Sequence, residues 1–371
     1  MWTNLTGGAK SFWTLSFLWL LQGFFHSQEC ESAKILSISF FASKSHKITY
    51  EKLILALAGR GHQVTYVGTY TSGKNVTNLK EVQALDIKTL DKYLHSSGNP
   101  FEIRQNVKSD LLSLLFNPFL FVGSALETVC RESYALPVIQ EILKEKYDLI
   151  FFSQFFNECL YGLLHKLNTT VVLFEPVSTF NWVAGNLGTP SPPSFTPSIL
   201  TGFTDQMTYV ERLMNFVAIT FNWAIMKFYY YPKMESVYRE YFNDPTIPSI
   251  EEIEKNVSIV LANSHVSITR PKALMPDIID VGGLHLEPAK PLPKVKKLEI
   301  LFQRDLTLRV FHSLNFCMYF QELDAFISGA GEHGFILFSM GSVLKGSIMP
   351  ESYRTMFLNV FPKLKQRVLW K

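Results

Sequence analysis

The chain has 371 residues, of which 47% are hydrophobic, and a formal net charge of +3 at pH 7. This length and composition suit roughly two domains with large apolar cores. Because the net charge is small and no Lys/Arg cluster stands out along the sequence, nothing indicates nucleic-acid binding.

A short apolar stretch lies close to the amino terminus. Residues 11–25 follow Lys10 and are too short for a comfortable membrane span, so they predict a secretory signal peptide within residues 1–30. Three Asn-x-Ser/Thr sequons beyond it fit a luminal or extracellular route, at Asn75, Asn168 and Asn256. The four cysteines have no metal-ligand spacing, which favours buried free thiols over a disulfide framework.

The first structural unit has the pattern strand, turn, helix, strand. Residues 35–41 form an apolar run typical of a strand buried on both faces, and the helical pattern of residues 47–60 ends at Gly61 before a second strand at 62–68. His46 lies in the first turn, where open α/β sheets bind ligands. The turn has no glycine, which disfavours a dinucleotide-binding fingerprint. From spacing alone, His46 is either a solvated or capping residue or a catalytic imidazole.

The pattern then alternates between strands and helices up to residue 174. We expect a strand at 82–87, helices within 104–145 that are interrupted at Asn117-Pro118, a buried strand at 147–153 with a helix to about 167, and a strand at 170–174. Such alternation is typical of a parallel, doubly wound sheet.

Proline and aromatic residues dominate the next segment. Residues 189–197 contain four prolines and predict a loop. Residues 213–231 predict a helix, for which two interpretations remain open: a mostly buried core helix with narrow polar stripes, or a helix lying on a membrane surface.

The carboxyl-terminal third repeats the strand pattern after a linker. Strands are expected at 257–262 and 278–281, followed by a glycine turn and the Pro-rich linker composition of residues 288–294. A second α/β unit then begins, with a strand at 334–340, a turn at Gly341-Ser342, a helix at 351–361 and a strand at 367–370.

Seven segments in this order resemble the UDP-glucuronosyltransferases and related UDP-glycosyltransferases. The matching segments are residues 43–46, 60–65, 189–192, 205–212, 281–285, 338–342 and 366–370. The resemblance implies an α/β fold of the GT-B type. It implies an acceptor-binding domain at 34–287, a linker at 288–333, and the start of a UDP-sugar-binding domain at 334–371.

The resemblance also implies a chemistry and a place in the cell. It implies that His46 is the general base that deprotonates a small lipophilic hydroxyl acceptor, and that the UDP-sugar is a co-substrate with no further cofactor or metal. Ser153 occupies the position of the Asp that many members place beside the base. Asp148 and Glu158 are alternative carboxylates for that role, although neither lies at the motif position. Gly341 and Ser342 occupy a donor-binding turn. Family members are anchored in the endoplasmic reticulum with their catalytic body in the lumen.

Two departures from the family pattern leave a second hypothesis open. Residues 295–321 have no counterpart in that pattern, and the chain stops at Lys371, before the rest of the donor domain and the carboxyl-terminal membrane helix. The chain is therefore expected to be either part of a sugar-transferring enzyme or an inactive, luminal or secreted isoform. Such an isoform would bind acceptors or pair with full-length relatives. A secreted carrier of hydrophobic ligands is a third interpretation, and it leaves the turn at Gly341 unexplained.

Overall fold

The computed structural model describes residues 32–73, 75–89, 118–198, 201–269, 272–288, 325–341 and 349–370. The predicted signal peptide, the helical pattern at 104–117, the stretch at 295–321 and Ser342 lie outside these residues.

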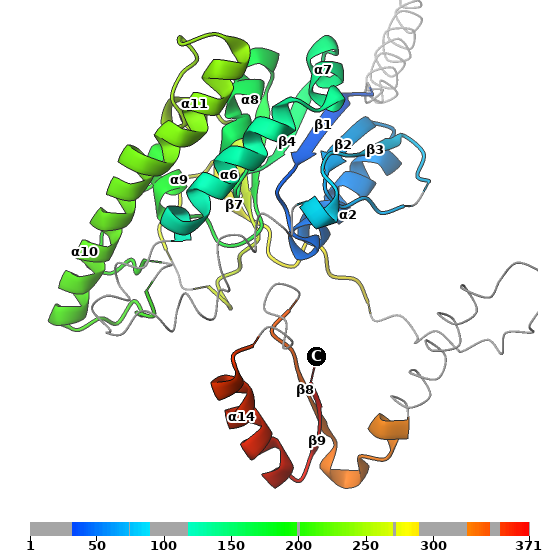
Figure 1. The fold of residues 1–371 in the computed structure, drawn as a ribbon, viewed down its shortest axis with the longest axis vertical. Coiled ribbons are helices and arrows are strands. Elements are labelled where there is room, and N and C mark those ends of the chain that lie inside the picture. The colour runs from blue at the N-terminus through cyan, green and yellow to red at the C-terminus, as the bar shows by residue number, and fades with distance from the viewer. Residues whose placement is uncertain are drawn as a thin grey trace, which may run out of the picture.

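A seven-stranded, wholly parallel sheet forms the centre of the chain (Figure 1). Its strand order is β3-β2-β1-β4-β5-β6-β7, so the chain winds outward first on one side of β1 and then on the other. The strands are β1 (Lys34–Ser39), β2 (Gln63–Gly68), β3 (Leu79–Gln83), β4 (Leu149–Ser153), β5 (Val171–Glu175), β6 (Ile259–Ala262) and β7 (Ile278–Asp280). The predicted doubly wound α/β class is confirmed.

The predicted strand at 82–87 is wrong in its position. Strand β3 ends at Gln83, and the carboxylate of Asp86 then accepts hydrogen bonds from the backbone N–H groups of Lys88 (2.8 Å) and Thr89 (3.0 Å). Because these two N–H groups bond to the capping side chain of a helical turn, they are not available for pairing in the sheet. The apolar Leu85 is still buried, which explains why the pattern resembled a strand.

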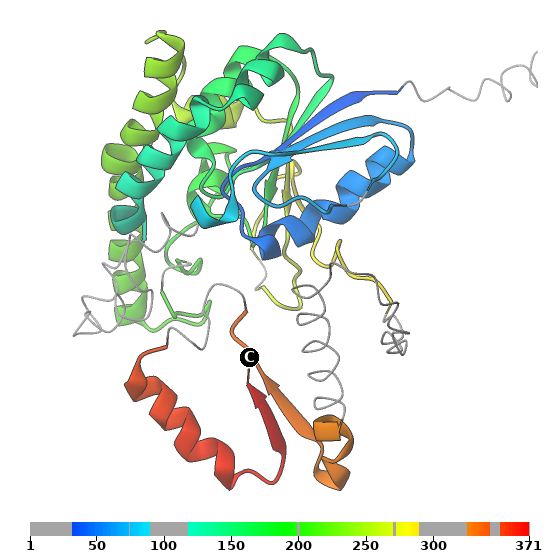
Figure 2. The same ribbon diagram turned by 45° about the vertical axis from the view of Figure 1, so that its right-hand side comes forward.

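Helices cover both faces of the sheet (Figure 2). In β1, Ile35 packs on one face with Tyr50 and Ile54 of α2, whereas Leu36 and Ile38 face the larger core beneath the other helices. The helical elements are α2 (Lys44–Gly59), α6 (Pro118–Tyr134), α7 (Pro137–Lys144), the 3₁₀ turn η1 (Glu158–Leu160), α8 (Tyr161–Leu167), α9 (Asn181–Asn186), α10 (Tyr209–Ile225), the π-helical η2 (Met226–Tyr230), α11 (Tyr231–Phe242) and α12 (Ile250–Lys255). Alternate residues thus bury apolar side chains on opposite faces, as a two-sided parallel sheet requires.

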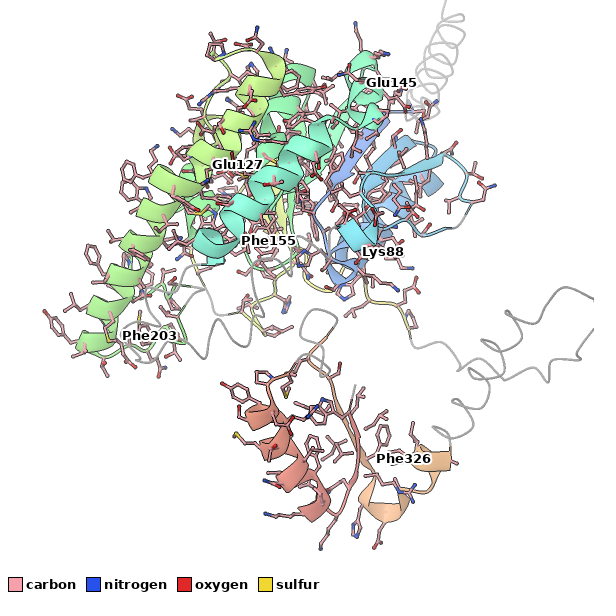
Figure 3. The ribbon with its side chains drawn as sticks, in the orientation of Figure 1. Lys88, Glu127, Glu145, Phe155, Phe203 and Phe326 are labelled. Atoms are coloured by element: carbon pink, nitrogen blue, oxygen red, sulfur yellow. A yellow bond between two sulfur atoms is a disulfide. The ribbon has the colours of Figure 1, made fainter. Side chains whose placement is uncertain are left out.

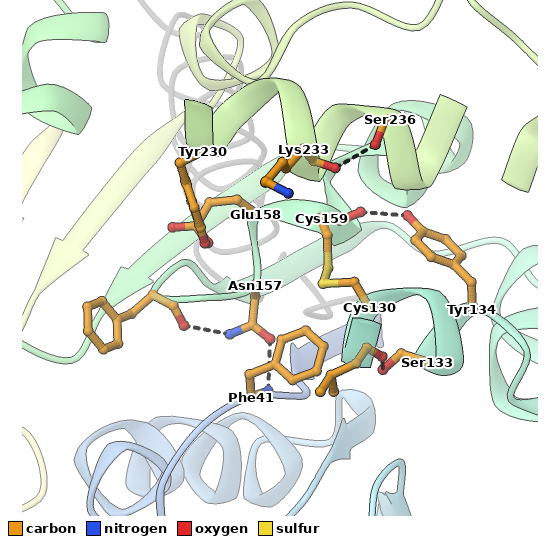
Figure 4. Close-up of a disulfide and its surroundings, with 12 residues drawn as sticks. Phe41, Cys130, Ser133, Tyr134, Asn157, Glu158, Cys159, Tyr230, Lys233 and Ser236 are labelled. Carbon is orange, nitrogen blue, oxygen red and sulfur yellow. Dashed lines mark hydrogen bonds between the residues drawn. A yellow bond between two sulfur atoms is a disulfide. The ribbon is translucent and has the colours of Figure 1, made fainter. Parts of the chain in front are cut away.

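A disulfide joins Cys130 of α6 to Cys159 of η1, with Cα atoms 6.2 Å apart (Figure 4). The prediction of buried free thiols is wrong for these two cysteines. Beside the bridge, the Tyr134 hydroxyl donates to the Cys159 carbonyl at 2.9 Å. The bridge therefore fixes α6 against the segment that follows β4.

Elements α10, η2 and α11 form one long helix. The core-helix interpretation predicted that this helix is mostly buried, but its outer side is exposed. Tyr209 is 83% exposed and Phe228 72% exposed, whereas Asn215 and Asn222 lie on the buried side. The buried Asn215 amide donates to the carbonyls of residues 193 (2.7 Å) and 196 (2.9 Å), and its oxygen accepts from the N–H of residue 198 (2.8 Å). Its polar group therefore holds the proline-rich loop, which the structure confirms as a loop. The membrane-surface interpretation stays a prediction.

No helix among the described residues combines the length and apolar character that crossing a bilayer requires. The second α/β unit is present as predicted, with a parallel pair of strands and one helix. Its elements are the 3₁₀ turn η3 (Gly331–His333), β8 (Phe335–Phe338), α14 (Glu351–Val360), the 3₁₀ turn η5 (Phe361–Lys363) and β9 (Arg367–Trp370). An aromatic cluster of Phe338, Phe357, Phe361 and Trp370 joins the strands to the helix.

Candidate functional site

The strand order has its switch point between β1 and β4, because the chain leaves these neighbours toward opposite sides of the sheet. Ligands of doubly wound sheets bind outside the carboxyl ends of the strands at such a point. His46 follows β1 at this edge, and Ser153 is the last residue of β4. The two residues predicted as a catalytic pair thus both belong to elements at the switch point.

Local interactions fix the start of α2 and therefore the position of His46. Ser43 is the N-cap residue, and its hydroxyl accepts from the His46 backbone N–H at 3.3 Å. One residue on, the ammonium group of the buried Lys47 pairs with Glu81 of β3 (2.8 Å) and with Glu51 (3.2 Å). The cap and the ion pairs hold the first turn of α2 against the sheet.

The imidazole of His46 lies in an apolar environment. Its ring meets the ring of Phe155 edge to face, with centroids 5.4 Å apart, and Figure 3 labels Phe155 at this end of the sheet. Its Nδ1 is buried and has no hydrogen-bond partner among the described residues. Burial lowers the pKa of His46 from 6.5 to about 4, because the charged imidazolium loses its hydration there. The ring is therefore neutral at physiological pH.

The pair of His46 and Ser153 is not joined by a hydrogen bond. The Ser153 hydroxyl is buried and, like the His46 Nδ1, has no partner within the part of the chain that the structure describes. Asp148, at the opposite end of β4, accepts from the backbone N–H of Lys34 at 2.7 Å. Glu158 accepts from the Tyr230 hydroxyl at 2.8 Å. Neither carboxylate orients the imidazole.

A wall of aromatic rings extends from His46 into the domain. Phe155 stacks on Phe180 with centroids 5.5 Å apart, and Phe180 stacks on Trp182 at 4.5 Å. Phe119 of α6 packs edge-on against Trp182 at 5.6 Å. Phe119 and Phe180 belong to the buried core, whereas Phe155 is partly exposed and Trp182 lines a cavity. The partly exposed rings are of the kind that binds apolar and aromatic ligands.

Two cavities lie beside α9, and the first of them also borders Trp182 and α10. The first has a volume of ≈ 320 Å³ and is lined by Asn181, Trp182, Gly185, Asn186, Ser191, Ser198, Ile219, Asn222, Trp223, Met226, Tyr231 and Glu251. The second has a volume of ≈ 290 Å³, and its lining includes Phe195, Phe203, Ile268 and Lys272. The proline-rich loop contributes to both, so the loop that Asn215 holds is also a wall of the cavities.

Sequence reasoning missed that three carboxyls are buried together in the core: Glu158, which it named only as an alternative partner of His46, Glu175 and Glu254. Burial raises the pKa of Glu158 to about 8 and that of Glu254 to about 7, and it raises the pKa of Glu175 well above its usual range. Glu254 accepts from the Tyr161 hydroxyl (2.9 Å) and from the Asn186 amide (2.6 Å). Glu158 and Glu175 have no acidic neighbour, and Glu254 ends the acidic run 251–254, so no motif distinguishes the three as buried.

The remaining predicted sites lie elsewhere. The sequon residues Asn75, Asn168 and Asn256 are all exposed. Gly341 adopts φ 86°, and its N–H donates to the Ser339 hydroxyl at 3.3 Å, so this N–H is already engaged. Within the described residues, no group of three or more His, Cys, Asp or Glu side chains is arranged to hold a metal ion.

Comparison with known proteins adds a family to this geometry. Residues 33–303 match the family described as UDP-glucoronosyl and UDP-glucosyl transferase. The chain is 28% identical over 341 residues to UDP-glucosyltransferase 2 of Dactylopius coccus, which covers 91% of the chain and 59% of that protein. It is 26% identical to UDP-glucuronosyltransferase 2B18 of Macaca fascicularis, which covers 97% of the chain and 63% of that protein.

The chain thus spans about three fifths of the length of these curated relatives, at 59% and 63%. Among solved structures, it is 14% identical to one described as the glycotransferase of kitacinnamycin, with a TM-score of 0.43. That similarity covers 92% of this chain and 66% of the other.

Proposed function

The chain belongs to the UDP-glucuronosyl and UDP-glucosyl transferase family, and from that premise we propose the role of its amino-terminal domain. In the whole protein, residues 34–287 bind a small lipophilic hydroxyl compound, and a UDP-sugar is the co-substrate that supplies the sugar. The membership carries with it the GT-B type of α/β fold. The partly exposed Phe155 beside His46 and the Trp182 ring that lines the larger cavity support a lipophilic acceptor, because apolar rings bind such compounds and exclude water.

His46 is the general base of this proposal. In an inverting transfer, the acceptor oxygen attacks the anomeric carbon, the bond from that carbon to the UDP oxygen breaks, and the acceptor proton moves to the imidazole. The observation that carries this role is a neutral imidazole at the switch point of the sheet. Its Nδ1 is buried and out of reach of a ligand, so the proton goes to the other ring nitrogen, Nε2, in this proposal. A neutral ring is ready to accept a proton, and the negative diphosphate of a bound donor would raise its pKa toward neutrality.

Ser153 cannot take the place of a carboxylate beside the base. A serine hydroxyl carries no charge, and this one makes no hydrogen bond to His46. We therefore assign Ser153 no part in proton transfer. The charge that stabilises the imidazolium comes from the donor in this proposal.

Removal of the imidazole tests the assignment. In a protein completed with the donor-binding half of a relative, His46→Ala should lower turnover by about a hundredfold or more, the usual size of a general-base effect. Acceptor affinity should change far less, because the aromatic wall remains. The matched control is His165→Ala, which removes an exposed histidine of α8. Unchanged turnover in the His46 variant would exclude the general-base role.

The cellular route is part of the same proposal. The predicted signal peptide and the exposed side chains of Asn75, Asn168 and Asn256 support entry into the endoplasmic reticulum lumen and glycosylation there. Digestion of the expressed protein with an endoglycosidase tests this route, since three occupied sequons would each change its electrophoretic mobility. Association with full-length relatives remains an expectation from the family resemblance.

A further inference from the structure

One buried side chain joins the two turns at the switch point of the sheet. The Oδ1 of the fully buried Asn157 accepts a hydrogen bond from the backbone N–H of Phe41 at 3.1 Å (Figure 4). Its Nδ2 donates to the carbonyl of Phe155 at 2.9 Å. Phe41 belongs to the turn between β1 and α2, and Phe155 to the turn after β4. The segment that leads to His46 is thus tied to the segment whose ring packs against the imidazole.

The two residues after Asn157 are fixed to other elements of the domain. The Glu158 carboxyl accepts from the Tyr230 hydroxyl of η2 at 2.8 Å. The Cys159 sulfur is bonded to Cys130 of α6. Three successive residues therefore hold the turn after β4 against three different parts of the fold, and the turn cannot move without breaking one of these bonds.

The backbone of this turn is held in an unfavourable conformation. Phe156 has φ 63°, in the left-handed region that is rare for a bulky side chain. Such a conformation persists only where the surrounding contacts enforce it, and it is found most often at functional sites. The Phe156 ring packs on Phe119 with centroids 5.8 Å apart. On its other side, the Asn157 N–H donates to the Gln154 carbonyl at 3.0 Å. These contacts give the neighbouring Phe155 one fixed position.

The Phe155 ring covers one side of the His46 imidazole. The two rings meet edge to face with centroids 5.4 Å apart, and burial is the cause of the lowered pKa of His46. Loss of the Asn157 amide would leave the Phe41 N–H and the Phe155 carbonyl unpaired. Both turns would then loosen, and water would reach the imidazole.

The charged groups on the elements packed around the imidazole are engaged or exposed, in the part of the chain that the structure describes. On α2, Lys44 is exposed and Lys47 pairs with Glu81. In η1, Glu158 is bonded to Tyr230, and burial raises its pKa to about 8, so it is uncharged in mild acid. A rise in the pKa of the imidazole therefore reports its exposure to water.

We propose that Asn157 is a positioning residue for His46, because its amide joins the two turns and keeps the Phe155 ring against the imidazole. The inference rests on the proposed function in one respect, which is that His46 is the base. It adds a residue that touches neither the substrate nor the reacting atoms. An imidazole held in one orientation presents the same nitrogen to every acceptor, as a general base requires.

Magnetic resonance of the 371-residue chain with isotope-labelled histidine tests the assignment. His46→Asn identifies the signal of His46 among the nine histidines. The pKa of His46 should be about 4 in the wild-type chain, and in Asn157→Ala it should rise above about 5, toward its ordinary value of 6.5. An unchanged pKa in the folded variant would overturn the inference.

The matched control is Asn215→Ala. The Asn215 side chain is equally buried and also bonds to backbone groups of a loop, but that loop is the proline-rich one. The control should therefore destabilise the chain without changing the pKa of His46. An equal rise of this pKa in Asn215→Ala and Asn157→Ala would show a general loosening of the fold, and would overturn the specific role of Asn157.

Phe155→Ala decides whether Asn157 acts through the ring. Each single variant should raise the pKa of His46, and the double variant should raise it no further than Phe155→Ala alone, because the ring that the amide positions is then gone. Additive changes would overturn this route. If Asn157→Ala does not fold, hydrogen exchange of the wild-type chain tests the contact itself. The Phe41 N–H should be strongly protected, and rapid exchange there would overturn the inference.

Turnover separates this inference from the proposed catalysis. In a protein completed with the donor-binding half of a relative, Asn157→Ala should lower kcat on the order of tenfold to a hundredfold, with little change in the KM of the acceptor. The acid limb of its kcat/KM profile should move to higher pH together with the pKa of His46, and an unmoved limb would overturn the inference. If His46→Ala keeps full turnover while Asn157→Ala raises the pKa of His46, the base is excluded and the positioning contact is kept. If His46→Ala abolishes turnover while Asn157→Ala changes neither turnover nor pKa, only the role of Asn157 is excluded.

Discussion

The buried state of His46 predicts a specific dependence of stability on pH. Its pKa is about 4 in the folded chain and 6.5 when exposed, so the unfolded chain binds a proton at higher pH than the folded chain does. Acid therefore favours unfolding between these two values, and the stability is fully present above the unfolded pKa. Linkage gives a loss of about 2 kcal/mol between about pH 7 and pH 5 from this one residue.

Urea unfolding of the wild-type chain and of His46→Asn at these two pH values measures the effect. The buried Glu158 and Glu254 have raised pKa values of about 8 and about 7, so they stabilise the fold as pH falls, and they do so in both proteins. The difference between wild type and variant thus isolates the imidazole. His165→Asn, at an exposed site, is the control. If wild type and His46→Asn respond equally to acid, the ring is not held neutral by burial, and the structural basis for the base is lost.

Two further predictions concern the frame around the site. The Cys130–Cys159 bridge joins cysteines 29 residues apart, so its reduction should lower the free energy of unfolding by about 3–4 kcal/mol. Urea titration with and without reductant measures this difference, and equal unfolding midpoints would contradict it. Asn215→Ala leaves one N–H and two carbonyls of the proline-rich loop unpaired, so it should cost about 2–4 kcal/mol. Hydrogen exchange at residue 198 should then become faster, and unchanged protection there would show that Asn215 does not hold the loop.

Most strands could be predicted from the sequence because they are buried on both faces. Such strands are continuous apolar runs, as residues 35–41 and 147–153 are, and little else produces that pattern between helical segments. The apolar pattern gave wrong predictions where the burial of a residue does not follow from its secondary structure. Leu85 is buried although it lies in a turn, and Phe228 is exposed although it lies in an apolar helix.

The disulfide and the burial of the glutamates could not be predicted from the sequence for a different reason. Cys130 and Cys159 meet because α6 packs beside the segment after β4. Glu158 is buried against Tyr230, and Glu254 against Tyr161 and Asn186, all of which are distant in the sequence. Contacts between segments that are distant in the sequence leave no local spacing pattern from which they could be predicted. His46 was accessible to prediction because its position depends on a local feature, the turn after the first strand.

The sequons and His46 lie at opposite edges of the parallel sheet. The three sequons lie close to the starts of β3, β5 and β6, because Asn75, Asn168 and Asn256 come shortly before residues 79, 171 and 259. His46 lies at the opposite edge, where β1 ends. A glycan is large and strongly hydrated, and at the carboxyl edge it would cover the aromatic wall and the cavities. If the three sequons carry glycans as proposed, their place at the amino edge keeps those glycans away from the edge where the proposed function puts the lipophilic acceptor and the sugar donor.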